Sequence, residues 1–142
     1  MKNIVVDTGP LVALFNARDR YHRDAIEFIK RASGSLITNI AAITEATYLL
    51  DFHLRAQQDF LAWAAEALVI DTDTHAELDR IAAVMKQYHD VPADFTDASL
   101  VVLCHRVRTQ LVATIDSDFL VYRNNQGAPF TNVFWQPNSS TN

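Results

Sequence analysis

Five acidic residues occupy positions where carboxylates could act together: Asp7, Glu45, Asp94, Asp97 and Asp116. Asp7 directly follows the apolar run IVV, and Asp116 directly follows LVATI. Each run is typical of a buried strand, and the carboxyl ends of parallel strands meet at one edge of a sheet. Mg²⁺ and Mn²⁺ prefer oxygen ligands, and two such ions about 4 Å apart can assist phosphodiester cleavage. The set therefore predicts a metal-dependent nuclease.

Each acid also has an ordinary structural interpretation. Asp7 and Asp116 could be turn or helix-cap residues, and Asp94 could be a plain N-cap. Asp94 and Asp97 are three residues apart at a predicted helix start, so they share one helical face and repel unless a cation lies between them. Glu45 lies in IAAITEATYLL, a stretch almost free of charge, where a buried and unpaired carboxylate would be costly. A metal ion would offset that cost.

The elements that must position these acids alternate between strands and helices. Predicted strands cover residues 2–6, 36–38, 68–70, 111–115 and 132–135. Predicted helices cover residues 11–16, 21–32, 40–52, 57–67, 74–85 and 94–107. Asn39 can cap the third of them, and Leu78, Ile81, Ala82 and Met85 are expected on the buried side of the fifth. Such alternation predicts an α/β fold, with a central, mainly parallel sheet between two layers of helices.

The bulk properties agree with one compact unit. The chain has 142 residues, of which 49% are hydrophobic, enough for a core without disulfides. We expect a single domain over residues 1–135 and a polar tail, QPNSSTN, over residues 136–142. Cys104, in an apolar stretch, is expected to be a core residue. The start, MKNIVVD, lacks the features of a signal peptide, so a cytoplasmic protein without a membrane segment is expected.

Charge and motifs narrow the chemistry. A net charge of −5 argues against a generic nucleic-acid binder but not against a nuclease whose carboxylates hold cations. The five histidines lack zinc-like spacing, and no Walker loop, GxGxxG or GxSxG motif is present.

Four strings in order resemble the motifs of PIN-domain proteins. They are IVVDTGPLVALF, ITEATYLL, ADFTDASLV and LVATIDSDF, and together they span residues 4 to about 122. The resemblance implies a three-layer α/β/α fold and Mg²⁺- or Mn²⁺-dependent hydrolysis of RNA. It implies that Asp7, Glu45, Asp97 and Asp116 form the catalytic quartet and that these four, with Asp94, bind the metal. It gives supporting positions to Thr8, Thr114 and Asp118.

The resemblance further implies a partner and an assembly. Small single-domain members are often VapC-type toxins, endoribonucleases of toxin–antitoxin pairs that a partner antitoxin inhibits and that often form homodimers. This chain departs from many of them in having less basic surface. Five arginines could line an RNA path, although ordinary solvated arginines explain them equally well: Arg18, Arg20, Arg23, Arg106 and Arg108.

The mechanistic hypothesis is hydrolysis by water activated on a metal ion. Asp7, Asp97 and Asp116 would hold the main ion, while Glu45 and Asp94 would serve a second ion or the attacking water. Two alternatives stay open. One is a phosphatase with an aspartyl nucleophile, although Gly9 stands where such enzymes usually have a second acid. The other is a non-catalytic PIN-like scaffold that binds a partner.

Overall fold

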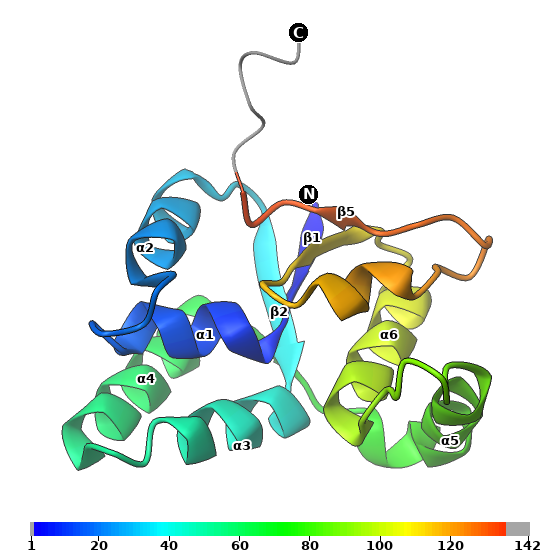
Figure 1. Ribbon diagram of the computed structural model, residues 1–142, viewed down its shortest axis with the longest axis horizontal. Helices are drawn as coiled ribbons and strands as arrows, with labels where there is room; N and C mark the ends of the chain where they lie inside the picture. Colours follow the sequence, from blue (N-terminus) through cyan, green and yellow to red (C-terminus); the bar gives the residue numbers. More distant parts are fainter. Residues whose placement is uncertain (1, 136–142) are drawn as a thin grey trace, which may run out of the picture.

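A computed structural model describes residues 2–135, and the predicted tail at 136–142 lies outside them. Helices and strands alternate for most of the chain (Figure 1). In order, the elements are β1 (Asn3–Val6), α1 (Thr8–Phe15), α2 (His22–Arg31), β2 (Ser35–Asn39), α3 (Ile40–Leu49), α4 (Leu54–Ala67), β3 (Val69–Asp71), η1 (Thr74–Glu77), α5 (Leu78–Gln87), α6 (Phe95–Val107), β4 (Leu111–Ala113), η2 (Ser117–Val121) and β5 (Thr131–Asn132).

The strands form one sheet in the order β3-β2-β1-β4-β5, and all its pairings are parallel. Val5 pairs with Ile37 on one side and Val112 on the other. The chain builds outward from β1 through β2 and β3, then crosses to the other side of β1 with β4. Strand order thus reverses between β1 and β4, where sheets of this kind bind ligands at the carboxyl ends of their strands.

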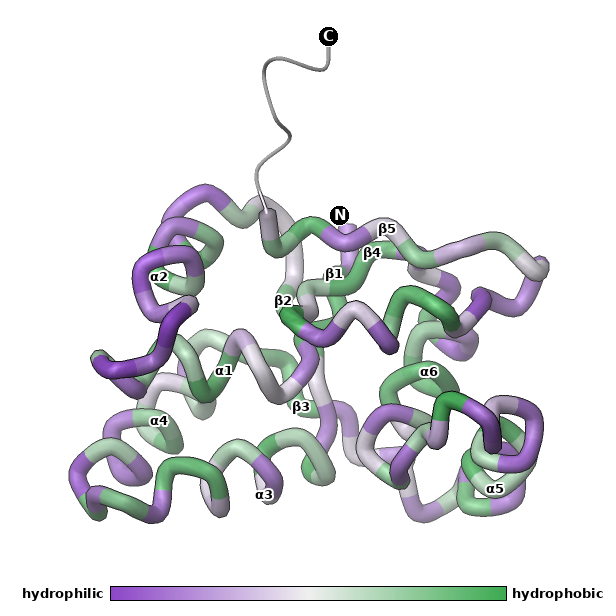
Figure 2. The backbone as a smooth tube through the Cα atoms, viewed as in Figure 1, coloured by the Kyte–Doolittle hydropathy of each residue, from purple (hydrophilic) through white to green (hydrophobic). Residues whose placement is uncertain are grey.

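Helices cover both faces of the sheet, so the predicted three-layer α/β/α architecture is confirmed (Figure 1). Successive side chains of β1 point to opposite faces of the sheet, so the strand contributes to the core on each side. Ile4 and Val6 face a core formed with α1 to α4, whereas Val5 faces a core formed with α5 and α6. Colouring by hydropathy places many polar residues on the outer helices (Figure 2). Among the described residues, no helix combines the length and apolar character needed to cross a membrane.

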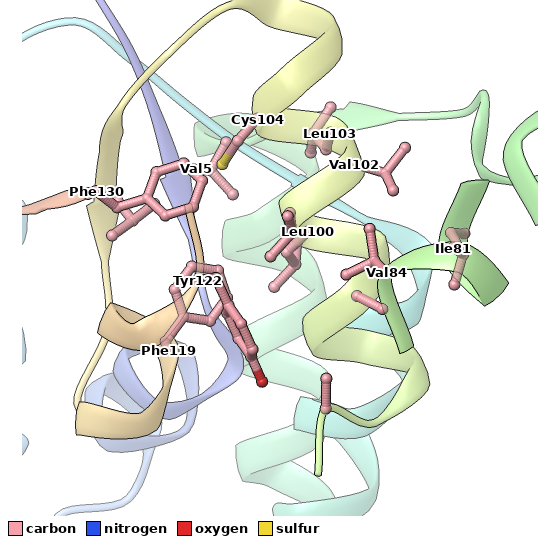
Figure 3. Close-up of a cluster of buried hydrophobic side chains, with 14 of the residues drawn as sticks. Val5, Ile81, Val84, Leu100, Val102, Leu103, Cys104, Phe119, Tyr122 and Phe130 are labelled. Atoms are coloured by element: carbon pink, nitrogen blue, oxygen red, sulfur yellow. The ribbon is translucent and has the colours of Figure 1, made fainter. Parts of the chain in front are cut away.

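Helix α6 is the central element of the second core. Its segment from Ala98 to Cys104 is almost entirely buried, between the sheet on one side and α5 and η2 on the other. Phe119 from η2 and Tyr122, directly after η2, pack beside Leu100 and Val5 (Figure 3). Because α6 is surrounded, its first turn has a fixed position relative to the sheet.

The predicted boundaries were wrong in several places. Helix α1 begins at Thr8 rather than residue 11, α3 ends at Leu49 rather than residue 52, and α4 begins at Leu54 rather than residue 57. Strand β4 ends at Ala113 rather than residue 115, and β5 covers only Thr131–Asn132. A 3-10 helix, η1, precedes α5, and of the predicted α5 face only Ile81 is buried, with Val84 beside it. Leu78, Ala82 and Met85 are exposed because α5 packs mainly along α6 and presents one narrow stripe to it.

Candidate active site

Asp7 lies where β1 gives way to α1 and is 6% exposed. Its Oδ1 accepts a hydrogen bond from the Thr8 backbone N–H at 2.8 Å, so the carboxylate caps α1. Its Oδ2 accepts one from the Thr114 hydroxyl, also at 2.8 Å. Thr114 in turn accepts one from the Asp116 backbone N–H at 3.0 Å. This chain of bonds joins the end of β1 to the segment after β4.

Burial raises the pKa of Asp7 from 3.8 to about 6, although its hydrogen bonds with Thr114 and Thr8 act in the opposite direction. The negative charges of Asp116 and Glu45 add to the increase. Desolvation and like charges both disfavour the ionised form. A cation near Asp7 would relieve both effects.

Asp97 lies in the first turn of α6 and is half-buried. Its pKa is raised from 3.8 to about 7, first by burial and then by the charges of Asp7 and Asp94. The Tyr122 hydroxyl donates a hydrogen bond to Asp97 Oδ2 at 3.2 Å and partly offsets the increase. Burial, together with the Asp97 charge, also raises the pKa of Tyr122, so this hydroxyl keeps its proton and remains a donor.

The remaining acids surround this pair. Asp94 is exposed and caps α6, its Oδ1 accepting from the Asp97 backbone N–H at 2.8 Å. Asp116 is exposed and caps η2, its Oδ1 accepting from the Asp118 backbone N–H at 2.9 Å. Glu45, on α3, is half-buried and acts electrostatically on Asp7. The structure thus brings all five predicted acids into one electrostatic cluster, while Asp118 lies exposed beside it.

The donor set suits a hard divalent cation, because it consists of carboxylates from separate segments. The Thr8 side chain adds a second observation. Its hydroxyl is buried next to Asp7 and has no hydrogen-bond partner within the described residues. Across residues 2–135, however, no three His, Cys, Asp or Glu side chains converge closely enough to form a complete metal cage. A bound ion would therefore keep several waters or draw the carboxylates inward, and Mg²⁺ commonly retains waters.

Several residues of this region were missed by sequence reasoning. Asn39 was predicted only as a cap for α3; its Oδ1 does accept from the Ala42 backbone N–H, but its buried amide also donates to Ser99 on α6 at 2.9 Å. Asn132 on β5 holds the backbone of Thr114 through two hydrogen bonds. A polar residue at the end of an apolar strand was the available signal for Asn39. Asn132 and Tyr122 carried none, because their partners are distant in sequence.

One of the five arginines considered for an RNA path, Arg106, is held by ion pairs within the fold. Arg106 forms ion pairs with Asp71 at 2.6 Å and Glu77 at 3.0 Å. These bonds join α6 to the end of β3 and to η1, so Arg106 stabilises the fold and is not free to line an RNA path. Cys104 is buried and free, as predicted for a core residue, and burial raises the pKa of its thiol.

Comparison with known proteins agrees with this geometry. The family model described as PIN domain matches residues 4–125. Ribonuclease VapC26 of Mycobacterium tuberculosis (strain ATCC 25618 / H37Rv) is 26% identical over 132 residues, which is 90% of this chain and 98% of the relative. The crystal structure of Mycobacterium tuberculosis VapC20, a Sarcin-Ricin loop cleaving toxin, superposes with a TM-score of 0.76. It is 22% identical and covers 82% of this chain and 92% of its own, so it supports the fold.

Proposed function

The chain belongs to the PIN domain family, and we propose that it is an Mg²⁺- or Mn²⁺-dependent endoribonuclease. The observation that carries the proposal is the electrostatic cluster at the switch point of the sheet. Two of its acids, Asp7 and Asp97, have pKa values raised to about 6 and about 7. Groups with strongly perturbed pKa values tend to gather at functional sites. A ribonuclease among the relatives and an RNA-cleaving toxin among similar folds support RNA as the substrate.

Asp7, Asp97 and Asp116 would hold the principal cation. Glu45, midway along α3, and Asp94, the N-cap of α6, would hold a second cation or orient the attacking water. A cation held there would supply charge neutralisation and Lewis acidity at the scissile phosphate.

The chain's own residues keep the carboxylates in place. The Thr8 backbone N–H and the Thr114 hydroxyl fix both oxygens of Asp7, and the Tyr122 hydroxyl fixes one oxygen of Asp97. Burial, together with the repulsion between the Asp7 and Asp97 carboxylates, raises the pKa of Asp97 to about 7, so the unloaded cluster is partly protonated near neutral pH, and cation binding would release that proton. Thr8 would position a water or a carboxylate through its otherwise unpartnered hydroxyl.

We further propose that the protein is the toxin of a toxin–antitoxin pair and acts as a homodimer held inactive by an antitoxin. The support is that a protein of similar fold, VapC20, is described as a toxin. Expression of the chain alone should arrest growth, and co-expression of the product of the adjacent gene should restore it. Growth arrest that persists in an Asp7→Asn variant would contradict a toxicity based on cleavage.

The direct test is cleavage of a mixed-sequence single-stranded RNA in Mg²⁺ or Mn²⁺. Wild-type protein should cleave it, EDTA should stop the reaction, and Asp7→Asn should remove at least about two orders of magnitude of rate. Glu66→Gln, which changes an exposed carboxylate on α4, is the matched control and should cleave normally. Equal cleavage by wild type and Asp7→Asn would refute the proposal. Calorimetric titration with Mn²⁺ distinguishes the nuclease from the non-catalytic scaffold. The scaffold alternative predicts that no Mn²⁺ binding depends on the carboxylates.

A further inference from the structure

A cleft of about 450 Å³ runs between α3 and the start of α6, beside the acid cluster. Ala41, Thr44, Glu45 and Tyr48 form one wall, and their spacing places them on a single face of α3. Phe95 and Thr96, in the first turn of α6, form the other wall. The two helices contact each other at this point, where α3 begins beside α6 (Figure 1).

Each wall carries an exposed aromatic ring; the α3 wall also carries an acid of the cluster, and the α6 wall directly follows one in the sequence. Glu45, which interacts electrostatically with Asp7, is one helical turn from Tyr48 on the same face of α3. Asp94, which interacts with Asp97, directly precedes Phe95. Tyr48 is 70% exposed and Phe95 is 42% exposed, so neither ring is used to fill the core. The cleft is therefore continuous with the proposed site rather than separate from it.

We propose that this cleft binds an unpaired nucleobase of the RNA next to the scissile phosphate, between the rings of Tyr48 and Phe95. The inference rests on the proposed function and specifies its substrate as single-stranded. Unpaired bases stack on aromatic side chains, whereas the bases of a duplex are already stacked on one another. Ala41 and Thr44, which also line the cleft, have small side chains that leave room for a base.

The charge of the cleft favours a base over a phosphate as its occupant. Its lining contains Glu45 but no lysine or arginine. A phosphate bound there would be repelled, whereas the flat, uncharged face of a base would not. Binding through stacking should also depend little on salt, unlike binding through phosphate contacts.

The experiment is a cycle of paired changes in protein and RNA. Tyr48→Ala and Phe95→Ala are each assayed on a single-stranded oligonucleotide and on versions with one abasic nucleotide, scanned across the cleavage site. Each alanine variant should raise KM by about 5- to 100-fold, the range expected for loss of one base–aromatic stack. The effect should disappear when the abasic nucleotide occupies the stacked position. Tyr48→Phe and Phe95→Tyr should restore KM.

Phe52→Ala is the matched control, because Phe52 is also an exposed aromatic residue, at 58%, but does not line the cleft. Its KM should equal that of wild type. The stacking proposal would be overturned if the alanine variants raised KM equally at every abasic position, or did not raise KM at all. Either outcome would leave the ribonuclease proposal intact. A changed oligomeric state in Tyr48→Ala without base dependence would likewise overturn it and assign the rings to a protein interface. No cleavage of any RNA by wild type would refute the proposed function itself, and the cleft proposal with it.

Discussion

Replacing Asp7 by asparagine should make the metal-free protein more stable at pH 8 while abolishing its activity. In the folded protein the pKa of Asp7 is raised from 3.8 to about 6. A shift of one unit corresponds to about 1.36 kcal/mol, so holding Asp7 ionised in the fold costs roughly 3 kcal/mol above pH 6. Asparagine carries no charge and removes this cost.

Part of this gain in stability is offset because the variant loses a hydrogen bond. The Thr8 N–H can still bond to the asparagine carbonyl oxygen, but the amide nitrogen cannot accept from Thr114 as Oδ2 does. The Thr114 hydroxyl must turn to the Asp116 carbonyl, 3.4 Å away, at a cost of about 1 kcal/mol. The net gain is then roughly 2 kcal/mol, or an increase in Tm of roughly 5–8 °C.

The gain should depend on pH in a defined direction. A carboxyl group with a raised folded-state pKa contributes stability that is complete below its unfolded pKa, near 3.9, and is lost as pH rises through the folded value. The difference between variant and wild type should therefore be absent or reversed at pH 3.5 and grow mainly between pH 4 and 6. Taking the difference cancels the titrating groups that do not interact with Asp7. Asp97 does interact with it, and because the Asp7 charge raises the pKa of Asp97, a smaller further gain should follow near pH 7.

Urea unfolding in EDTA across this pH range measures the difference, with Glu66→Gln as the exposed-carboxylate control. Adding Mg²⁺ at pH 8 should stabilise wild type but not the variant, because the cation binds only where the carboxylates remain. The reasoning fails if Asp7→Asn is less stable than wild type at pH 8 in EDTA, or if the difference does not change with pH.

Three further changes test the supporting structure. Thr114→Val removes the hydroxyl between Asp7 and Asp116, and we expect a loss of about 1–3 kcal/mol in urea unfolding together with weaker Mn²⁺ binding by calorimetry. Arg106→Met leaves the buried Glu77 carboxylate with only the longer ion pair to Arg80, at 3.6 Å, and should cost about 2–4 kcal/mol of unfolding free energy, with cleavage retained in the folded fraction. Leu100→Ala opens a cavity in the core beside α6 and should cost about 2–5 kcal/mol; a loss under 1 kcal/mol would show that this core repacks.

The sequence was sufficient to predict the architecture because its patterns are local. Strand β1 ends at Val6 and α3 begins after the Asn39 cap, as the apolar run and the capping residue indicated. The α5 face could not be predicted in the same way. Leu78 and Met85 have the helical spacing of Ile81, but whether such residues are buried depends on how closely a neighbouring helix approaches, and α6 covers only one stripe.

The positions of the acids were predictable from chain order, whereas their environment was not. That Asp7 and Asp116 follow strands could be read from the sequence, yet β4 ends at Ala113 and Thr114 turns inward to bond Asp7. The Tyr122 hydroxyl reaches Asp97 from 25 residues away, because η2 folds back over α6. Contacts of this kind depend on the packing of whole elements, which no local pattern encodes.

Capping and catalysis are not competing interpretations for these acids. Asp7, Asp94 and Asp116 each use Oδ1 to accept a backbone N–H at a helix start. A cap occupies one oxygen and restricts the rotation of the carboxylate; in Asp7 the second oxygen also accepts from the Thr114 hydroxyl but keeps a further lone pair. Three helix starts thereby restrict three carboxylates whose charges act on Asp97. A substitution that preserves capping but removes charge, such as Asp to Asn at any of the three, should therefore separate the structural role from the chemical one.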